Sequence, residues 1–287
     1  MCKAIENSTP EQKALYLAGM RKTVPHKQEL IMPWLTGLSV VDVGCADAFF
    51  TQSLLQECKK VVGIDISPEI VKMAQAEWPK CQDDIEFRVA NVENFTEPVD
   101  NVVCSSVLHE VYSYGEGLKS VGRAIANIHK NLNSRGRIII RDFIKPVFAG
   151  PVEFRHYKLD ITEGHRYLNF HSARHTDPVN WWKFSCTNTM ETWEKTFGQK
   201  MEDVYEYIFH KDFHNNWETE VKETYGFWTL EEAKSILTAH GFKIIHATEM
   251  ENQWIVDNRL KGKVKILSDS VELPFPKYQC LIVAEKA

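Results

Sequence analysis

A turn built from small residues near the start of the chain could bring a ligand close to the backbone. The segment VVDVGCADAFFTQ, residues 40–52, changes from a β-branched run to helical spacing after Gly44. Glycine leaves φ free and places no side chain beside the ligand, and the amides of the following helix point toward it. The expected contacts from this turn are Asp42, Gly44, Cys45 and Ala46.

Polar residues also end the next three apolar runs. Asp65 closes VVGIDIS, where a carboxylate can accept hydrogen bonds from both ribose hydroxyls of a nucleoside. Asn91 follows the third run and is suitably placed to meet an adenine edge. The fourth run ends in CSSVLHEVYSY, residues 104–114, where strand order should reverse and open α/β sheets place their ligands. The expected contacts from these ends are Asp65, Asn91, Val92, Ser105 and Ser106.

A dinucleotide fits the small-residue turn poorly. In the register of a G-x-G-x-x-G motif, Ala46 replaces the glycine that faces the pyrophosphate, and Phe49 replaces the one that packs helix against strand. Asp47 would place a carboxylate beside a diphosphate, whereas beside a sulfonium and an α-amino group it is harmless or useful. These residues favour a nucleoside that carries positive charge over NAD.

Together these positions resemble the class I S-adenosylmethionine-dependent methyltransferases, over residues 38–144 and again from about 229 to 286. The resemblance implies S-adenosylmethionine as cofactor and S-adenosylhomocysteine as product, and it implies that Ile66 lies beside the adenine. It also implies a seven-stranded, mostly parallel Rossmann-like sheet whose last strand is antiparallel. The departures are Ala46 and Ala48 at glycine positions and Asn91 for a more usual aspartate. An alanine methyl group at these positions is expected to require a negative φ.

His109 and Tyr112 are the candidate catalytic residues, because they follow the fourth run close to where the methyl group should lie. Methyl transfer is an in-line displacement, so a base is needed only if the nucleophile must lose a proton. His109 could take that proton, or it could only cap a helix or line the cofactor pocket. Tyr112 could line the acceptor site or be ordinary packing. Arg141 and Asp142 could hold the acceptor, but a structural ion pair is the favoured interpretation.

Two pairs of histidines have the spacing of metal ligands on one face of a helix. They are His171 with His175 and His210 with His214. No neighbouring cysteine or carboxylate completes a tetrahedral set by spacing, so no metal site is predicted.

Apolar runs alternate with helical spacing, which is typical of an α/β fold with a parallel sheet and helices on both faces. Strands are expected at 40–43, 60–64, 85–89, 99–105, 137–143, 242–248 and 278–284. Helices are expected at 49–58, 68–78, 118–132 and 230–239.

The chain divides into three expected parts. Residues 1–37 are an N-terminal helical lid, residues 38–144 and 229–287 are the cofactor-binding core, and residues 145–228 are a mostly helical insertion after the fifth strand. Most of the 8 tryptophans lie in the insertion, which is expected to cap the acceptor. Tyr16 and Arg21 of the lid are expected near the cofactor.

The composition limits the partners and the compartment. The net charge is −5 and the cations are scattered, which argues against a nucleic-acid backbone as partner. The 7 cysteines are dispersed, as free thiols in a reducing compartment are. No apolar stretch is long enough to span a membrane and no signal-peptide core is visible, so a cytoplasmic protein is expected.

The leading hypothesis is therefore a methyltransferase that acts on a small-molecule acceptor. The alternatives are an RNA- or protein-directed methyltransferase, an enzyme that transfers another group of S-adenosylmethionine or cyclises it, and a binding module without turnover. The sequence leaves the oligomeric state open.

Overall fold

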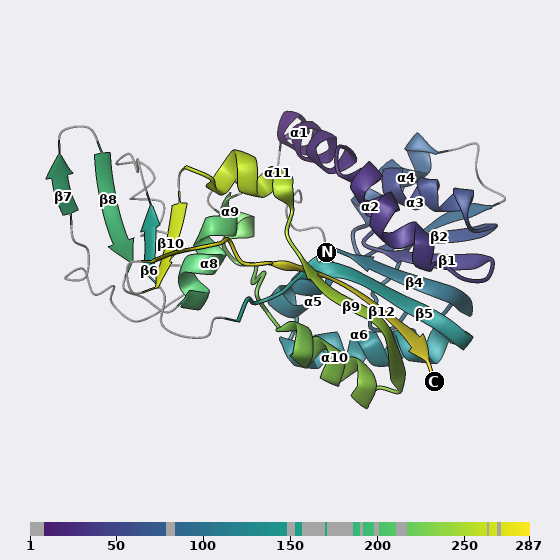
Figure 1. Cartoon of the computed structure of the whole chain (residues 1–287). Helices are drawn as coiled ribbons and strands as arrows, with labels where there is room; N and C mark the ends of the chain where they lie inside the picture. The colour runs from purple at the N-terminus through teal and green to yellow at the C-terminus, as the bar shows by residue number, and fades with distance from the viewer. Residues whose placement is uncertain are drawn as a thin grey trace. The chain divides into compact units, whose positions relative to one another are not determined.

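The computed structural model describes residues 9–78, 84–147, 153–156, 170, 186–189, 192–197, 201–210, 217–262, 264–268 and 271–287 (Figure 1). The chain folds into two compact units. The first unit contains residues 1–144, 227–249 and 279–287, and the second contains residues 145–226 and 250–278.

A seven-stranded sheet forms the centre of the first unit, in the order β3-β2-β1-β4-β5-β12-β9. Its strands are β1 (Ser39–Val43), β2 (Lys60–Asp65), β3 (Ile85–Val89), β4 (Val99–Ser105), β5 (Leu132–Phe143), β9 (Phe242–Met250) and β12 (Gln279–Lys286). The pairs that join β3 through β5 are parallel, and β12 is antiparallel to β5. The predicted α/β, Rossmann-like sheet with an antiparallel last strand is confirmed.

Helices cover both faces of this sheet (Figure 1). On one face lie α2 (Val24–Ile31), α3 (Phe49–Ser53) and α4 (Pro68–Glu77), and on the other α5 (Leu108–Tyr114), α6 (Leu118–Asn131) and α10 (Leu230–Ala239). Helix α1 (Pro10–Arg21) precedes them, and short 3-10 turns occupy Met32–Trp34 and Leu54–Gln56. The helices expected at 68–78, 118–132 and 230–239 are confirmed.

The amphipathic pattern of the sequence explains how these helices pack. In α6, Val121, Ala124, Ile125 and Ile128 are buried at helical spacing and join the core of the sheet. Helix α10 begins with a capping box, in which the Thr229 hydroxyl accepts the Glu232 amide and the Glu232 carboxylate accepts the Thr229 amide.

The second unit contains a five-stranded sheet of its own, in the order β11-β10-β6-β8-β7, in which each pair of neighbouring strands is antiparallel. Its strands are β6 (Glu153–His156), β7 (Cys186–Thr189), β8 (Thr192–Phe197), β10 (Val264–Ser268) and β11 (Val271–Leu273). Helices α8 (Met201–His210), α9 (Trp217–Glu220) and α11 (Gln253–Ile255) accompany it, and a π-helical turn follows at Val256–Leu260.

The prediction of a mostly helical insertion at 145–228 is not confirmed, because the described part of that segment contains β6, β7 and β8 as well as helices. Residues 250–278 also group with this unit rather than with the core to which the sequence pattern assigned them. Two of its strands, β10 and β11, come from that later segment, so the sheet is assembled from distant parts of the chain and has no local signature.

Aromatic side chains pack together inside the second unit. Phe170 contacts the rings of Tyr207, His210 and Trp217, and the Phe209 ring lies 4.2 Å from that of Tyr278. In the described part of the chain, no helix combines the length and the apolar character needed to cross a membrane.

Candidate functional site

The turn after β1 lies directly against the end of β2. Both the Gly44 and the Cys45 amides donate to the Ile64 carbonyl, at 2.8 and 3.1 Å, and Asp65 follows that residue. Gly63 permits this approach, since a Cβ there would lie 2.9 Å from the Cys45 Cβ. The small-residue turn and the predicted ribose-binding carboxylate are therefore neighbours, as the sequence predicted.

The backbone of this turn corrects one expectation. Gly44 has a φ of +74°, but Ala46 and Ala48 also have positive φ, at 47° and 67°. The expectation that alanine at these positions needs a negative φ was wrong. Left-handed backbone conformations cost a residue with a Cβ on the order of 1 kcal/mol, so the turn is strained at both alanines. Such strain persists where the surrounding structure fixes it, and it is common at ligand sites.

Asp65 is buried and its carboxylate organises the turn. Its Oδ1 accepts the Ser67 amide at 2.9 Å, and this amide and the nearby Ala46 and Ile66 backbone act to lower the pKa of the carboxyl group. Burial raises its pKa despite these donors. Asn91, after β3, makes a similar local turn, in which its side-chain oxygen accepts the Glu93 amide at 2.9 Å.

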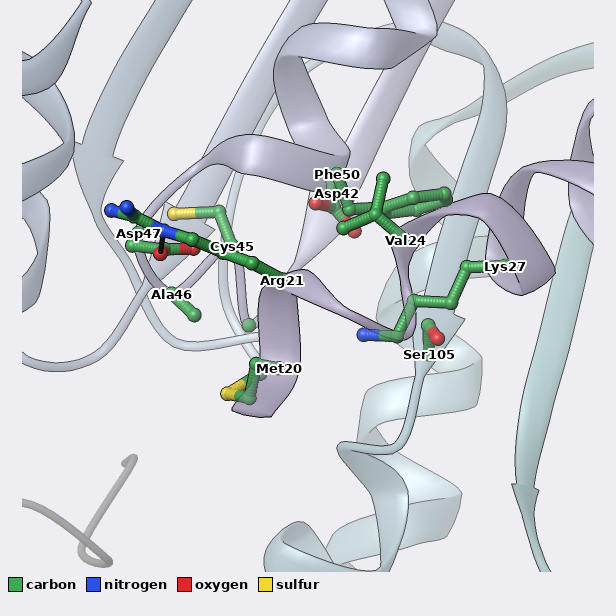
Figure 2. Close-up of a pocket in the computed structure, with 11 residues that line it drawn as sticks. Met20, Arg21, Val24, Lys27, Asp42, Cys45, Ala46, Asp47, Phe50 and Ser105 are labelled. Carbon is green, nitrogen blue, oxygen red and sulfur yellow. Dashed lines mark hydrogen bonds and ion pairs between the residues drawn. The ribbon is translucent and has the colours of Figure 1, made fainter. Parts of the chain in front are cut away.

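A pocket opens beside the turn (Figure 2). Its lining includes five predicted cofactor contacts, which are Asp42, Gly44, Cys45, Ala46 and Ser105. The lining also includes Met20, Arg21, Val24, Lys27, Asp47 and Phe50. The other predicted contacts, Asp65, Ile66, Asn91, Val92 and Ser106, are not part of this lining.

Helices α1 and α2 contribute the lining residues that sequence reasoning mostly missed. Lys27 is only 8% exposed, and it lies one helical turn before the fully buried Ile31. A lysine on the apolar face of a helix is the signal that could have identified it. Arg21 was a lid candidate, and it lines the pocket; the side chain of Tyr16 lies outside the described residues.

Arg21 fastens the end of α1 to the turn. Its Nε lies 2.7 Å from the Asp47 carboxylate, and its guanidinium lies over the Phe49 ring at 3.7 Å. The Trp78 indole packs edge-on against Phe49 and donates to the Asp47 carbonyl. The sequence analysis expected Asp47 to lie beside the positive groups of the cofactor. In this structure Asp47 is paired with the Arg21 cation.

Asp42 places a buried carboxylate at the end of β1, inside the pocket lining. Burial raises its pKa to about 6, while the Thr51 hydroxyl, which donates to Oδ2 at 2.6 Å, opposes that rise. A buried carboxylate without a full set of donors is costly in water-free surroundings. A cationic ligand in the pocket would offset that cost.

The end of β4 carries two serines with different surroundings. Ser105 is 8% exposed, and its hydroxyl has no hydrogen-bond partner in the described structure. Ser106 has a φ of 57°, and its amide donates to the Arg141 carbonyl at 2.7 Å. Its hydroxyl accepts a hydrogen bond from the Arg141 guanidinium at 3.0 Å.

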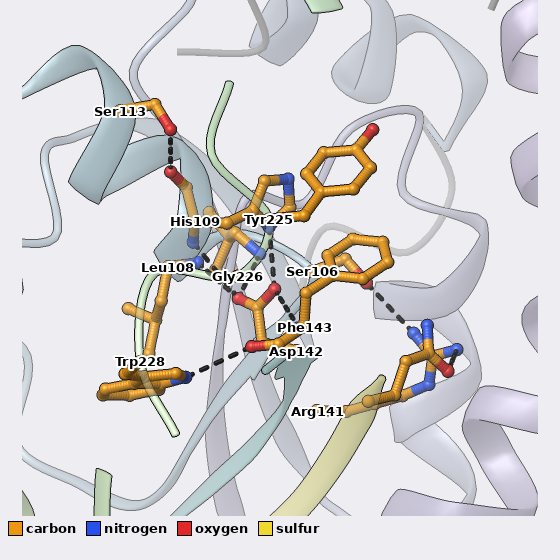
Figure 3. A network of polar contacts seen from close by, with 12 residues as sticks. Ser106, Leu108, His109, Ser113, Arg141, Asp142, Phe143, Tyr225, Gly226 and Trp228 are labelled. Carbon is orange, nitrogen blue, oxygen red and sulfur yellow. Dashed lines mark hydrogen bonds and ion pairs between the residues drawn. The ribbon is translucent and has the colours of Figure 1, made fainter. Parts of the chain in front are cut away.

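Asp142 and His109 form a buried pair next to these serines (Figure 3). The Asp142 Oδ1 lies 2.7 Å from the His109 Nδ1, and its Oδ2 accepts the amides of Val107, Leu108 and His109. The ion pair favoured for Arg141 with Asp142 is therefore not what the structure shows. Neighbouring residues of a strand point to opposite faces, so Arg141 contacts Ser106 and Gln279 while Asp142 faces α5.

None of the described contacts of Tyr112 is with His109 or Asp142. Its ring packs against Phe227 at 5.4 Å and against the core of the sheet. Among the described residues no cluster of three or more potential metal ligands occurs. His210 stacks on Tyr225, and His171, His175 and His214 lie outside the described residues.

Residues 35–213 of the chain match the model of a protein family whose description is "Methyltransferase domain". The chain belongs to that family. The match begins just before β1 of this methyltransferase-domain protein and covers the turn, Asp65 and the His109–Asp142 pair, so the predicted family is confirmed.

Two curated relatives match shorter segments of the methyltransferase-domain protein. An uncharacterized methyltransferase of Schizosaccharomyces pombe is 28% identical over 121 residues, which are 38% of this chain and 40% of the relative. A ubiquinone biosynthesis O-methyltransferase of Xanthomonas oryzae pv. oryzae is 32% identical over 81 residues, which are 27% of this chain and 34% of the relative. The matched segments thus span less than half of either relative.

Two solved structures share the fold of the methyltransferase-domain protein. The pyocyanin biosynthetic protein PhzM has a TM-score of 0.52 and 12% identity, with 97% of this chain and 59% of that chain covered. A putative methyltransferase from Bacillus halodurans C-125 has a TM-score of 0.51 and 14% identity, with 90% and 97% covered. At these identities the likeness supports the fold alone.

Proposed function

We propose that this methyltransferase-domain protein binds S-adenosylmethionine at the turn after β1 and transfers its methyl group to a small molecule. The observation that carries the proposal is the contact of the Gly44 and Cys45 amides with the Ile64 carbonyl. This contact places a left-handed, small-residue turn beside the carboxylate of Asp65, with a pocket on its other side. Family membership gives the reaction class.

The charges of the pocket suit a cationic cofactor. Asp42 is a buried carboxylate whose pKa burial raises to about 6. A sulfonium and an α-ammonium group nearby would favour its ionised form, which a phosphate would not. The ribose then extends toward Asp65 and Ile66, and the adenine toward Asn91 and Val92.

The transfer itself asks little of the protein beyond positioning. The sulfonium is already an activated methyl donor, so the enzyme aligns the acceptor for in-line displacement and excludes water. His109, oriented by Asp142, takes the proton that the nucleophile loses as the new bond forms. Since Nδ1 faces the Asp142 carboxylate, the proposed base is the other ring nitrogen, Nε2. Tyr112 and Ser106 stay predictions as contacts of the acceptor and the cofactor.

A base held in this way suits an acceptor with a hydroxyl or amine that must be deprotonated. The match with a ubiquinone biosynthesis O-methyltransferase favours a small molecule with a hydroxyl group. The cysteines that the structure gives as free thiols, Cys45, Cys58, Cys104 and Cys280, support a reducing compartment such as the cytoplasm. The acceptor-cap role of residues 145–228 stays a prediction.

Calorimetric titration with S-adenosylmethionine and S-adenosylhomocysteine tests the proposal. The wild-type protein is expected to bind one molecule of either, and Asp65→Ala is expected to bind about 5- to 150-fold more weakly, because charge-assisted hydrogen bonds to the ribose are lost. Asp84→Ala, an exposed carboxylate just before β3, is the matched control and should bind as the wild type does. Binding of neither ligand by the wild type would overturn the proposal.

A further inference from the structure

A buried lysine without a hydrogen-bonded carboxylate lines the pocket. Lys27 lies on α2 with 8% of its surface exposed, and its ammonium group lies 5.7 Å from the centre of the Phe50 ring. The Asp42 carboxylate accepts a hydrogen bond from Thr51, and the Asp47 carboxylate accepts one from Arg21. In the described structure neither carboxylate is hydrogen-bonded to Lys27. A buried cation in this position is costly unless an anion joins it.

A second polar group faces the same space. The Ser105 hydroxyl is buried at the end of β4 without a hydrogen-bond partner in the described residues, and Ser105 lines the same pocket. Figure 2 draws Lys27 and Ser105 among the side chains that line the pocket, with the Lys27 side chain extending from α2 along it. Buried hydroxyls are rarely left without a partner, so this pair indicates a missing acceptor.

We propose that Lys27 and Ser105 bind the α-carboxylate of the cofactor's methionine moiety. The inference rests on the proposed function, because it assumes that the adenosine lies at Asp65. With the ribose there, the chain from the sulfur leads past Gly44 into the pocket of Lys27 and Ser105. A carboxylate satisfies both groups at once, since it accepts from the ammonium and from the hydroxyl.

The charged groups around Lys27 indicate why an anion is needed. Burial, and then the Arg141 cation of β5, lower the pKa of Lys27 to about 8, while Asp42, Asp47 and Asp142 raise it less. A bound carboxylate would raise that pKa again. Binding above pH 8 should therefore take up a proton onto Lys27, and binding at pH 6.5 should not.

A pair of ligands that differ only in the carboxylate isolates the contact. Decarboxylated S-adenosylhomocysteine keeps the adenosine, the sulfur and the amine. In calorimetric titrations, Lys27→Met should lower the affinity for S-adenosylhomocysteine by about 10- to 100-fold. Its affinity for the decarboxylated ligand should stay within about 2-fold of that of the wild type. Ser105→Ala should show the same selectivity with a smaller loss, and Lys27→Arg should recover part of the affinity.

Lys22→Met is the matched control, since Lys22 is an exposed lysine between α1 and α2. It should leave both affinities unchanged. Titration at pH 8.5 in buffers of different ionisation enthalpy should show proton uptake in the wild type that Lys27→Met lacks.

Two results would overturn the inference while the proposed function stands. In the first, Lys27→Met binds S-adenosylhomocysteine as the wild type does. In the second, it loses affinity equally for both ligands, which would make Lys27 a structural residue. Failure of the wild type to bind S-adenosylhomocysteine at all would instead overturn the proposed function. Thermal unfolding of Lys27→Met separates misfolding from loss of the contact, and Ser105→Ala gives an independent test.

Discussion

The Asp142 carboxylate and the His109 imidazole lie buried together, with Oδ1 and Nδ1 2.7 Å apart. The other oxygen of Asp142 accepts backbone amides at the start of α5, so the carboxylate is fixed by the helix that carries His109. A hydrogen on Nδ1 would donate to this carboxylate, so the proposed role of base falls to the other ring nitrogen, Nε2.

Replacement of Asp142 by asparagine should reverse that assignment. The amide oxygen is expected at the Oδ2 position, where it keeps three backbone amides and loses only that of Phe143, so the amide nitrogen would face His109 and Nδ1 would have to accept. Methyl transfer to the acceptor should fall at least about 100-fold in kcat, and His109→Gln and the double variant should fall no further. Nitrogen-15 NMR of the imidazole should show the proton moving from Nδ1 to Nε2. An unchanged tautomer in Asp142→Asn would contradict this account.

The positive φ of Ala48 predicts an unusual response to glycine. Ala48 and Ala74 are both fully buried, so either glycine substitution loses one packed methyl group. Ala74 lies in α4, where glycine costs about 1 kcal/mol more, whereas at Ala48 glycine relieves a left-handed strain of on the order of 1 kcal/mol. Urea unfolding should therefore find Ala48→Gly more stable than Ala74→Gly by about 2 kcal/mol. Equal losses would show that Ala48 is not strained.

Gly44→Ala should test the fit between the turn and the start of α5. A Cβ at Gly44 would lie 2.9 Å from the Val107 side chain, on a backbone with a φ of +74°. Gly262 has the same φ and no atom within 4 Å of its Cβ position. Both substitutions pay about 1 kcal/mol for the backbone, but Gly44→Ala should cost at least about 1 kcal/mol more from crowding. Identical unfolding midpoints would remove the argument for a close contact.

Asp42 should make the stability of the protein depend on pH. Its pKa is about 6 in the folded state and is raised from 3.8, so the folded state binds more protons than the unfolded state between these values. The free energy of unfolding should therefore fall as pH rises from about 4 to 6, by on the order of 2 kcal/mol, and then level off. Asp42→Asn keeps the acceptor for Thr51 and lacks this loss. It should be more stable than the wild type at pH 7.5 and equal to it near pH 4, in urea unfolding at both pH values; a difference independent of pH would refute this.

Local patterns were enough to predict the sheet and the position of its polar ends. Asp65 and Gly44 were found because each follows an apolar run, and parallel strands bring such ends to one edge. The partner of Asp142 was not predicted, because Arg141 is its neighbour in sequence while His109 is its neighbour in space.

The rest depends on contacts between distant segments. From the sequence, Lys27 is indistinguishable from a polar residue of a surface helix. In the structure it is buried, because α2 packs onto the turn. The sheet of the second unit pairs β6 with β10, and no periodicity links residues so far apart. The turn imposes a positive φ on Ala46 and Ala48, which alanine disfavours. The residue types therefore predicted the wrong sign of φ at both positions.

A crystal structure with S-adenosylhomocysteine tests the central claim most directly. We expect the two ribose hydroxyls to lie within roughly 2.5–3.0 Å of the Asp65 carboxylate and the homocysteine chain to pass Gly44. Ligand bound elsewhere, or an Asp65 carboxylate that stays turned away from the ribose, would contradict it.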